Sequence, residues 1–450
     1  MCVPSNKGYR HLIIGCLVLL TMVVLVKLGV CFYNECSLTY PLYAVLEPRV
    51  SLFLLLPCAL FLIWVLVMEA LGDSLILPAS FVFSTLFNLS VAMAREGVIG
   101  VFRPFTRTDL EYIGDVSRVE SVGTFLRDYT DLMPTLSGHG RTHPPGPILL
   151  LWVLRKLLGE GPLIASVCVI VLGSLSVLFV YYLARRIYNQ QTARHSILLF
   201  TLVPSYVLFT ATSMDAVFAT LCGVSVWLFY RALTGESLTD SLLCAIVVTL
   251  ALHFSFVYLT LLPFFAIVGM YSLCQSPDRK RILRNLGLMF FACLCLNALI
   301  RLATGFNIVT AFFVAKTINY SAHPLVSARH YAYIFVGNPL AFLIYLGVPT
   351  IVLFVKEISV LFRSFPRVSS QGSYVFSFLT TLFLTNSAGL FTVLEVERIW
   401  LFFVPFVAIP AGRALFQWTK QSDSQLPVRI VLTLLFVQLI AFQLLLYTYW

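Results

Sequence analysis

The chain alternates long apolar runs with short polar connections. Windows of about 19 residues, the length suited to detecting membrane spans, identify thirteen apolar stretches. They cover residues 11–32, 50–71, 74–94, 161–183, 195–213, 215–233, 238–254, 255–274, 284–304, 335–355, 373–394, 399–417 and 430–449. A helix needs about 20 apolar residues to cross a bilayer. The pattern predicts an all-α integral membrane protein, a single polytopic domain over residues 1–450 with about thirteen transmembrane helices.

The polar connections differ in their content of basic residues. If the N-terminus is cytoplasmic, the connections on its side of the membrane carry the arginine and lysine clusters at 185–194, 279–284, 356–367 and 413–429. Cytoplasmic loops of membrane proteins are enriched in these two residue types. The predicted order of the spans is therefore consistent with the distribution of positive charge.

Two long connections then fall on the outer side, at residues 95–160 and 306–335, together with a short turn at 395–398. These three segments hold a large share of the ionisable residues that lie outside the cytoplasmic connections. Binding and catalytic residues are concentrated in loops, and charge near a membrane is costly unless it has a role. The candidate functional residues therefore belong to these segments.

The first outer loop contains two short helical patterns. Apolar residues recur every three positions from Leu110 to Phe125, which predicts an amphipathic helix lying on the membrane surface. Residues 138–147, GHGRTHPPGP, precede an apolar run of about eleven residues that is too short to span a bilayer. Because proline suits the first turn of a helix, we expect a second interfacial or re-entrant helix there. Thr142 or His143 would lie just before its N-terminus, where an anion is favoured.

Composition narrows the class of protein further. Hydrophobic residues make up 59% of the chain and charged residues 11%, and the mean hydropathy is +0.92, which excludes a soluble globular domain. The formal net charge of +10 requires no nucleic-acid partner, because much of it lies in the cytoplasmic clusters. The sequence contains no Walker A or GxGxxG motif, so nothing in it indicates a nucleotide site.

Several short motifs resemble the GT-C superfamily of polyprenyl-phosphate-sugar glycosyltransferases. They are an acidic pair followed by tyrosine at Asp109, Glu111 and Tyr112, the THPPG sequence at 142–146, and the segments 204–229 and 397–406. The resemblance, which extends to protein O-mannosyltransferases and the lipid A aminoarabinose transferase, implies transfer of a hexose or pentose from a lipid-phosphate donor to an acceptor hydroxyl. The acceptor would be a lipid, a glycan or a protein, and the reaction would invert with a carboxylate as general base.

The resemblance also implies roles for individual residues. Catalysis would fall to Asp109, Glu111 and Asp115, with Asp109 the first choice as base, although leucine replaces the usual glutamate at position 110. Cations would stabilise the departing phosphate, and the other polar side chains would contact substrate. The candidate phosphate ligands are Arg141, His143, Lys316, Arg329 and Arg398, and the candidate substrate contacts are Tyr112, His139 and Glu397.

Simpler interpretations stand beside these. The three carboxylates are also compatible with the solvated face of a surface helix, Glu397 and Arg398 with a pair that caps a helix end, and Asp215 with a favourable charge at a helix N-terminus.

Three further questions stay open. No cofactor is assigned, but a divalent metal ion is kept as an alternative because Asp109, Glu111, His139 and His143 include suitable ligand types. A secondary transporter or lipid flippase is the alternative function, although no internal repeat is found. A bacterial plasma membrane with an outer-face site is preferred to an endoplasmic reticulum membrane with a lumenal site.

Overall fold

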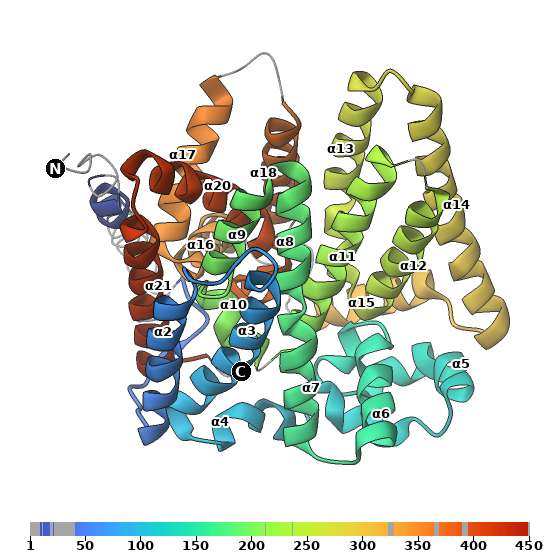
Figure 1. The fold of residues 1–450 in the computed structure, drawn as a ribbon. Coiled ribbons are helices and arrows are strands. Elements are labelled where there is room, and N and C mark those ends of the chain that lie inside the picture. Colours follow the sequence, from blue (N-terminus) through green and yellow to red (C-terminus); the bar gives the residue numbers. More distant parts are fainter. Residues whose placement is uncertain are drawn as a thin grey trace.

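The computed structural model describes residues 10, 12–18, 21, 41–211, 213–235, 237–322, 328–363, 369–388 and 395–448. These residues are almost entirely helical (Figure 1), and the two strands among them, β1 (Val45–Leu46) and β2 (Leu446–Tyr447), form one antiparallel pair. Most of the predicted span at 11–32 lies outside the described residues. The all-α membrane class predicted from the sequence is confirmed.

Seven helical segments in the described part are long and apolar enough to cross a membrane, and two bent pairs raise the number to nine. The seven are α3 (Ile76–Glu96), α7 with α8 (Pro162–Ile187), α11 (Asp215–Thr234), η6 with α13 (Phe256–Gln275), α14 (Arg279–Thr304), α19 to α20 (Val396–Ser422) and α21 (Leu426–Leu445). The protein is therefore a multi-pass membrane protein. The count of thirteen is not confirmed, partly because α2 (Leu55–Val67) and α12 (Leu238–Phe254) are shorter.

The stretch 335–355, predicted as one span, is broken instead. Helix α16 (Ala328–Leu346) and helix α17 (Val348–Arg363) meet at Gly347, whose φ of 84° ends the first helix, and the pair is bent by 106°. The Gln438 side chain accepts a hydrogen bond from the Val348 N–H at 3.0 Å and donates one to the Ile344 carbonyl at 2.9 Å. Backbone groups released by the bend are thus satisfied from a distant helix.

The second bent pair covers the span predicted at 195–213. Helix α9 (Gln190–Phe200) and helix α10 (Pro204–Thr210) differ in direction by 60°. Proline at position 204 begins the second helix and lacks the N–H that would continue the first. The break brings the end of α10 close to the start of α11.

The loop between α3 and α7 folds into a group of short helices at one end of the bundle, below α12 and α14 in the view of Figure 1. In chain order they are α4 (Ile99–Phe102), η2 (Pro104–Thr106), η3 (Tyr112–Arg118), α5 (Val122–Leu132), η4 (Met133–Thr135), η5 (Gly140–Thr142) and α6 (Gly146–Leu158). The remaining elements are η1 (Leu52–Leu54), α15 (Ile308–Ala322), α18 (Ser370–Ala388) and η7 (Trp400–Phe403).

The single amphipathic helix predicted from Leu110 to Phe125 is wrong. A seven-residue 3₁₀ helix, η3, comes first, and α5 starts separately after Ser121, whose side chain accepts the Thr124 N–H at 3.2 Å. The apolar spacing of three residues is the period of a 3₁₀ helix and not the 3.6 of an α-helix. Of the six apolar positions in the pattern, however, only Ile113 and Val116 lie in η3, while Val122 and Phe125 lie in α5.

The short helix predicted after the Pro-Pro-Gly sequence is present as α6, which has 13 residues. It begins at Gly146, against the end of α12. A Cβ atom on Gly146 would lie 2.4 Å from the His253 carbonyl oxygen, so glycine is required for this approach. The connection predicted at 306–335 is also largely helical, since α15 fills its first half and packs against η5 and α5.

Candidate functional site

Four ionisable or aromatic side chains from η3, η5 and the residues that flank them meet in the short-helix region. The His139 Nδ1 atom lies 3.4 Å from the Glu111 carboxylate, and both side chains are mostly buried. The ring of Tyr112 lies 5.5 Å from that of His139 and 5.6 Å from that of His143, centroid to centroid. A carboxylate, two imidazoles and a phenol therefore share one small volume.

Backbone hydrogen bonds hold these two segments together. The N–H of Gly138 donates to the Asp109 carbonyl and that of His139 to the Leu110 carbonyl, each at 2.9 Å. The buried Tyr129 hydroxyl on α5 contacts the His143 carbonyl at 2.7 Å and the Gly140 carbonyl at 3.1 Å. The glycine-rich sequence before THPPG is thereby fixed against the acidic segment.

Asp115 also links the acidic segment to the glycine-rich segment. Its carboxylate is buried and accepts the Ser137 N–H at 3.1 Å, while Arg118 lies 3.8 Å away. A Cβ atom on Gly140 would fall 2.3 Å from its Oδ2 atom. This geometry gives Asp115 a positioning role, because its oxygens are committed to the loop that carries His139 and His143.

A second group of charges comes from α11 and α19 (Val396–Ile399). Arg398 is buried and donates to the Asp215 carboxylate at 2.6 Å and to the Glu395 carboxylate at 2.7 Å. Ser213 lies 3.3 Å from the same guanidinium. The Glu397 carboxylate accepts the backbone N–H of Tyr43 at 2.7 Å. Arg398 is thus held between two carboxylates, and Glu397 is bonded to the backbone of the segment that contains Tyr43.

The two groups act on each other electrostatically. Burial raises the pKa of the Tyr112 phenol well above its ordinary value, and the carboxylates of Asp215 and Glu111 add to that effect. Burial also lowers the pKa of His143 to about 4, with a further lowering from His139 and a partial offset from Asp215. Asp215 therefore lies close enough to both residues to belong to the same site.

His143 is consequently a neutral imidazole at physiological pH. Its Nδ1 atom lies 3.0 Å from the His139 carbonyl oxygen, so Nδ1 carries the proton and donates there. The Nε2 atom is then left as a hydrogen-bond acceptor. A neutral histidine supplies no positive charge to a phosphate, which shifts that role to the neighbouring arginine and lysine side chains.

The other residues predicted from the sequence differ in how deeply they are buried. Asp109 and Arg141 are exposed, and Lys316 is half-buried on α15, the helix that packs against η5. The side chain of Arg329 lies outside the described residues. The structure thus brings together Glu111, Tyr112, His139 and His143, and the charge of Arg398 acts on Tyr112. Asp109 is exposed.

The contact of Asp215 with Arg398 was not predicted from the sequence. The position of Asp215 at the first turn of α11 suggested only a favourable helix-end charge. Its partner Arg398 is 183 residues away, so no local pattern reveals the pair. The one available signal was the Ser-Met-Asp sequence at 213–215, polar residues between two apolar runs.

The four residues considered as metal ligands are only partly grouped. Glu111 and His139 are in contact, Asp109 is exposed, and the Nδ1 atom of His143 is bonded to a carbonyl group. Within the described ranges, no group of three or more His, Cys, Asp or Glu side chains is arranged to hold a metal ion.

An apolar groove of about 760 Å³ lies between α6, α12 and α14. Pro145 and Gly146, the residues directly after the two-histidine segment, line one part of it, and aliphatic side chains line most of the rest. These include Leu149, Val153, Leu250, Leu299 and Ala303. The THPPG segment therefore contributes both to the polar cluster, through His143, and to the lining of the groove, through Pro145 and Gly146.

Residues 142–304 match the family described as dolichyl-phosphate-mannose-protein mannosyltransferase. The matched region starts at the threonine of THPPG and ends at the last residue of α14, so it contains all three helices of the groove. The resemblance to GT-C glycosyltransferases seen in the sequence is confirmed over this part, which is less than half of the chain. A comparison with curated proteins by sequence gives no match.

Solved structures of two other membrane enzymes are similar to this chain at low identity. ArnT from Cupriavidus metallidurans bound to undecaprenyl phosphate has a TM-score of 0.47 and 16% identity, covering 66% of this chain and 57% of that one. The oligosaccharyltransferase of Archaeoglobus fulgidus, in complex with zinc and sulfate, has a TM-score of 0.48 and 14% identity, covering 81% and 53%. The chain thus spans little more than half the length of either protein.

Proposed function

We propose that this protein is a membrane glycosyltransferase that moves a sugar from a polyprenyl-phosphate donor to an acceptor hydroxyl. The observation that carries the proposal is that Pro145 and Gly146, which follow His143 in the THPPG segment, line the apolar groove, while His139 and His143 lie with Glu111 in the polar cluster. A donor with a long apolar tail and a charged phosphate needs both surfaces side by side. The family match over 142–304 supports the same reaction class.

The polyprenyl chain would lie in the groove between α6, α12 and α14. Its lining is almost wholly apolar, so hydrocarbon would contact hydrocarbon there and associate through van der Waals packing. The phosphate would then sit at the N-terminus of α6, where backbone N–H groups and the helix dipole favour an anion. Arg141 on η5 and Lys316 on the adjacent α15 would supply the positive charge.

Glu111 is the better candidate for the general base. Its carboxylate is buried and held by His139, whereas the side chain of Asp109 is exposed to solvent. A base whose position is fixed by a neighbour loses less conformational entropy when it is oriented for the reaction. The acceptor oxygen would form a bond to the sugar C1 atom as its proton passes to Glu111. The bond from C1 to the phosphate oxygen would break on the opposite face, leaving the polyprenyl phosphate with the bonding electrons.

The first experiment is sugar transfer by the purified protein in liposomes, with radiolabelled polyprenyl-phosphate mannose as donor. Glu111→Gln should lower kcat at least about 100-fold, the usual cost of losing a general base, while Asp109→Asn retains most activity. Asp131→Asn, an exposed carboxylate on α5, is the matched control and should behave as the unmodified protein.

The outcomes separate the two levels of the proposal. An inactive Asp109→Asn beside an active Glu111→Gln would move the base to Asp109. Full activity in both variants would remove both assignments. Movement of intact donor lipid across the bilayer without any transfer, in the same liposomes, would indicate the flippase instead.

A further inference from the structure

The strand β2 contacts the segment that leads into the acidic residues. The side chain of Arg107, which directly follows η2, donates from Nη2 to the Tyr447 hydroxyl on β2 at 2.9 Å. These two residues are 340 positions apart in the chain. We infer that Tyr447 is a positioning residue that fixes the turn carrying Glu111, and that it acts through Arg107. The inference rests on the proposed function, in which Glu111 is the general base.

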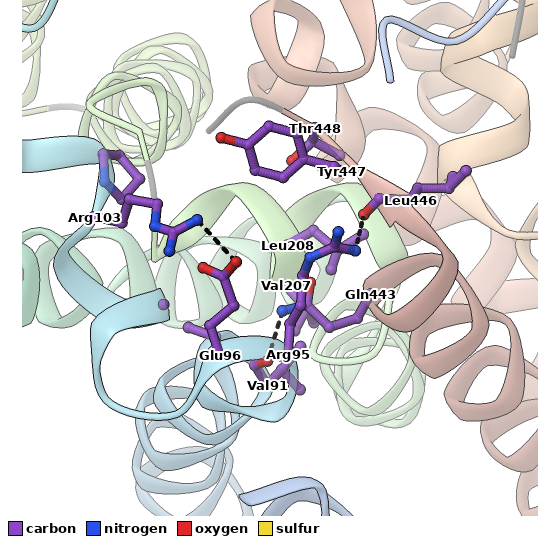
Figure 2. A pocket seen from close by; sticks show the side chains of 13 residues that line it. Val91, Arg95, Glu96, Arg103, Val207, Leu208, Gln443, Leu446, Tyr447 and Thr448 are labelled. Atoms are coloured by element: carbon purple, nitrogen blue, oxygen red, sulfur yellow. Dashed lines mark hydrogen bonds and ion pairs between the residues drawn. The ribbon is translucent and has the colours of Figure 1, made fainter. Parts of the chain in front are cut away.

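Tyr447 is itself held from two sides. Its backbone pairs with Val45 in the antiparallel contact between β1 and β2. The Arg95 guanidinium lies 5.4 Å from the centre of the Tyr447 ring and donates from Nη1 to the Leu446 carbonyl at 3.1 Å. Figure 2 shows Arg95, Leu446 and Tyr447 together where α3 and α21 end. A strand pair and a cation–π contact therefore support the hydroxyl that meets Arg107.

Arg107 begins a tight turn that ends at Glu111. The Arg107 carbonyl accepts the Glu111 N–H at 2.8 Å and the Leu110 N–H at 3.2 Å. Thr108 packs directly against η3, since a Cβ atom on Gly114 would overlap the Thr108 carbonyl oxygen. The turn is thus anchored by η3 and, at its start, by the Arg107 side chain. A change at the Tyr447 hydroxyl therefore reaches Glu111 through one side chain and one backbone hydrogen bond.

The contact between Arg107 and Tyr447 suits a positioning role. Both side chains are half-buried, which limits competition from water, and a charged donor makes a stronger hydrogen bond than a neutral one. Rates depend steeply on position, since a displacement of about 1 Å near the reacting atoms can cost about 100-fold. The turn keeps its other supports when the hydroxyl is lost. We therefore expect a smaller loss of kcat, about tenfold, and not complete inactivation.

Arg103 provides a comparison within the same segment. It lies four residues before Arg107 and donates to the Glu96 carboxylate at 2.8 Å, a contact drawn in Figure 2. Its side chain is 38% exposed, and Glu96 also accepts from Arg49 at 2.8 Å. Exposed ion pairs contribute little. Substitution of Arg103 therefore removes a neighbouring arginine contact without removing the one to Tyr447.

The test is a double-mutant cycle on sugar transfer by the full-length protein in liposomes, with polyprenyl-phosphate mannose as donor. Tyr447→Phe removes the hydroxyl but keeps the ring beside Arg95, so kcat should fall about tenfold while Tm and the KM for the donor stay nearly unchanged. Arg107→Met should give the same decrease, and the double variant no further decrease, because both substitutions remove one contact. Arg103→Met is the matched control and should lower kcat less than about twofold, an effect that multiplies with that of Tyr447→Phe.

Hydrogen–deuterium exchange gives a second measurement that does not depend on the reaction. Because the Glu111 N–H is bonded to the Arg107 carbonyl, a peptide covering 107–114 should exchange faster in Tyr447→Phe and Arg107→Met than in Arg103→Met.

The outcomes separate this inference from the proposed function. An unchanged kcat in Tyr447→Phe, or multiplicative effects of Tyr447→Phe and Arg107→Met, would overturn the inference. If Tyr447→Phe does not fold, Arg107→Met decides, and an unchanged kcat in that variant would overturn it as well. If the unmodified protein transfers no sugar, the proposed function fails, and the exchange rates alone then support or overturn the positioning of the turn.

Discussion

At the scale of single residues, groups that are close in sequence can differ strongly in burial. Glu111 and Asp109 are two positions apart, yet one is enclosed with His139 and the other faces solvent. His143 is similarly defined by its surroundings, which remove its positive charge at neutral pH. Under the proposed function, His143 would therefore offer the site a hydrogen-bond acceptor, its Nε2 atom, and not a cation.

The lowered pKa of His143 predicts how stability changes with pH. In the unfolded chain the imidazole takes up a proton near its ordinary value of 6.5, but in the folded protein it does so only near 4. Between these values the unfolded state binds more protons, so stability is highest above about pH 6.5 and falls as the pH decreases toward 4. We expect Tm to drop on going from pH 7.5 to pH 5, and to drop less in His143→Asn. Equal decreases in the two proteins would contradict this assignment.

At the scale of elements, the contact between α6 and α12 sets the position of the THPPG segment. Gly146→Ala places a methyl group 2.4 Å from the His253 carbonyl and 2.7 Å from the Phe254 ring. Overpacking of this kind costs about 1–3 kcal/mol, and here it also pushes apart two walls of the donor groove. We expect a lower Tm together with a higher KM for the polyprenyl donor.

The control for this substitution is Gly123→Ala on α5, where a new Cβ atom would have nothing within 4 Å. An alanine in an open helical position is neutral or slightly stabilising. If Gly146→Ala changes Tm and KM no more than Gly123→Ala does, the close contact between α6 and α12 is not rigid enough to position the donor.

The elements also show what a sequence can reveal about this fold. The apolar runs and the Pro-Pro-Gly start of α6 were predictable because hydropathy and the fixed φ of proline act locally. The bend at Gly347 was not, because the glutamine that satisfies it stands 90 residues further along the chain. The pairing of Asp215 with Arg398 escaped for the same reason. Features set by neighbouring residues could be predicted from the sequence, whereas hydrogen-bond and ion-pair partners that are distant in the sequence could not.

At the scale of the whole molecule, the groove between α6, α12 and α14 should act on the donor through the length of its apolar tail. Leu299→Trp places a large side chain in the groove and should raise KM several-fold for a long polyprenyl donor, but little for a donor with one or two isoprene units. Kinetic assays with the two donors test this. Leu302→Trp, on the same helix but 84% exposed and outside the groove lining, is the control.

An equal effect of Leu299→Trp on long and short donors would place the tail elsewhere. An equal effect of the two tryptophan variants would show that bulk on α14, and not occupation of the groove, is responsible.

The pairing of β1 with β2 carries a consequence for biosynthesis. Residues 45–46 can find their partners only after residues 446–447 have emerged from the ribosome, and the Tyr447 hydroxyl then receives a hydrogen bond from Arg107 at 2.9 Å. Arg107 in turn accepts the Glu111 N–H through its carbonyl group at 2.8 Å. In a nascent chain, residues 107–111 therefore lack this contact until residues 446–447 have been synthesised.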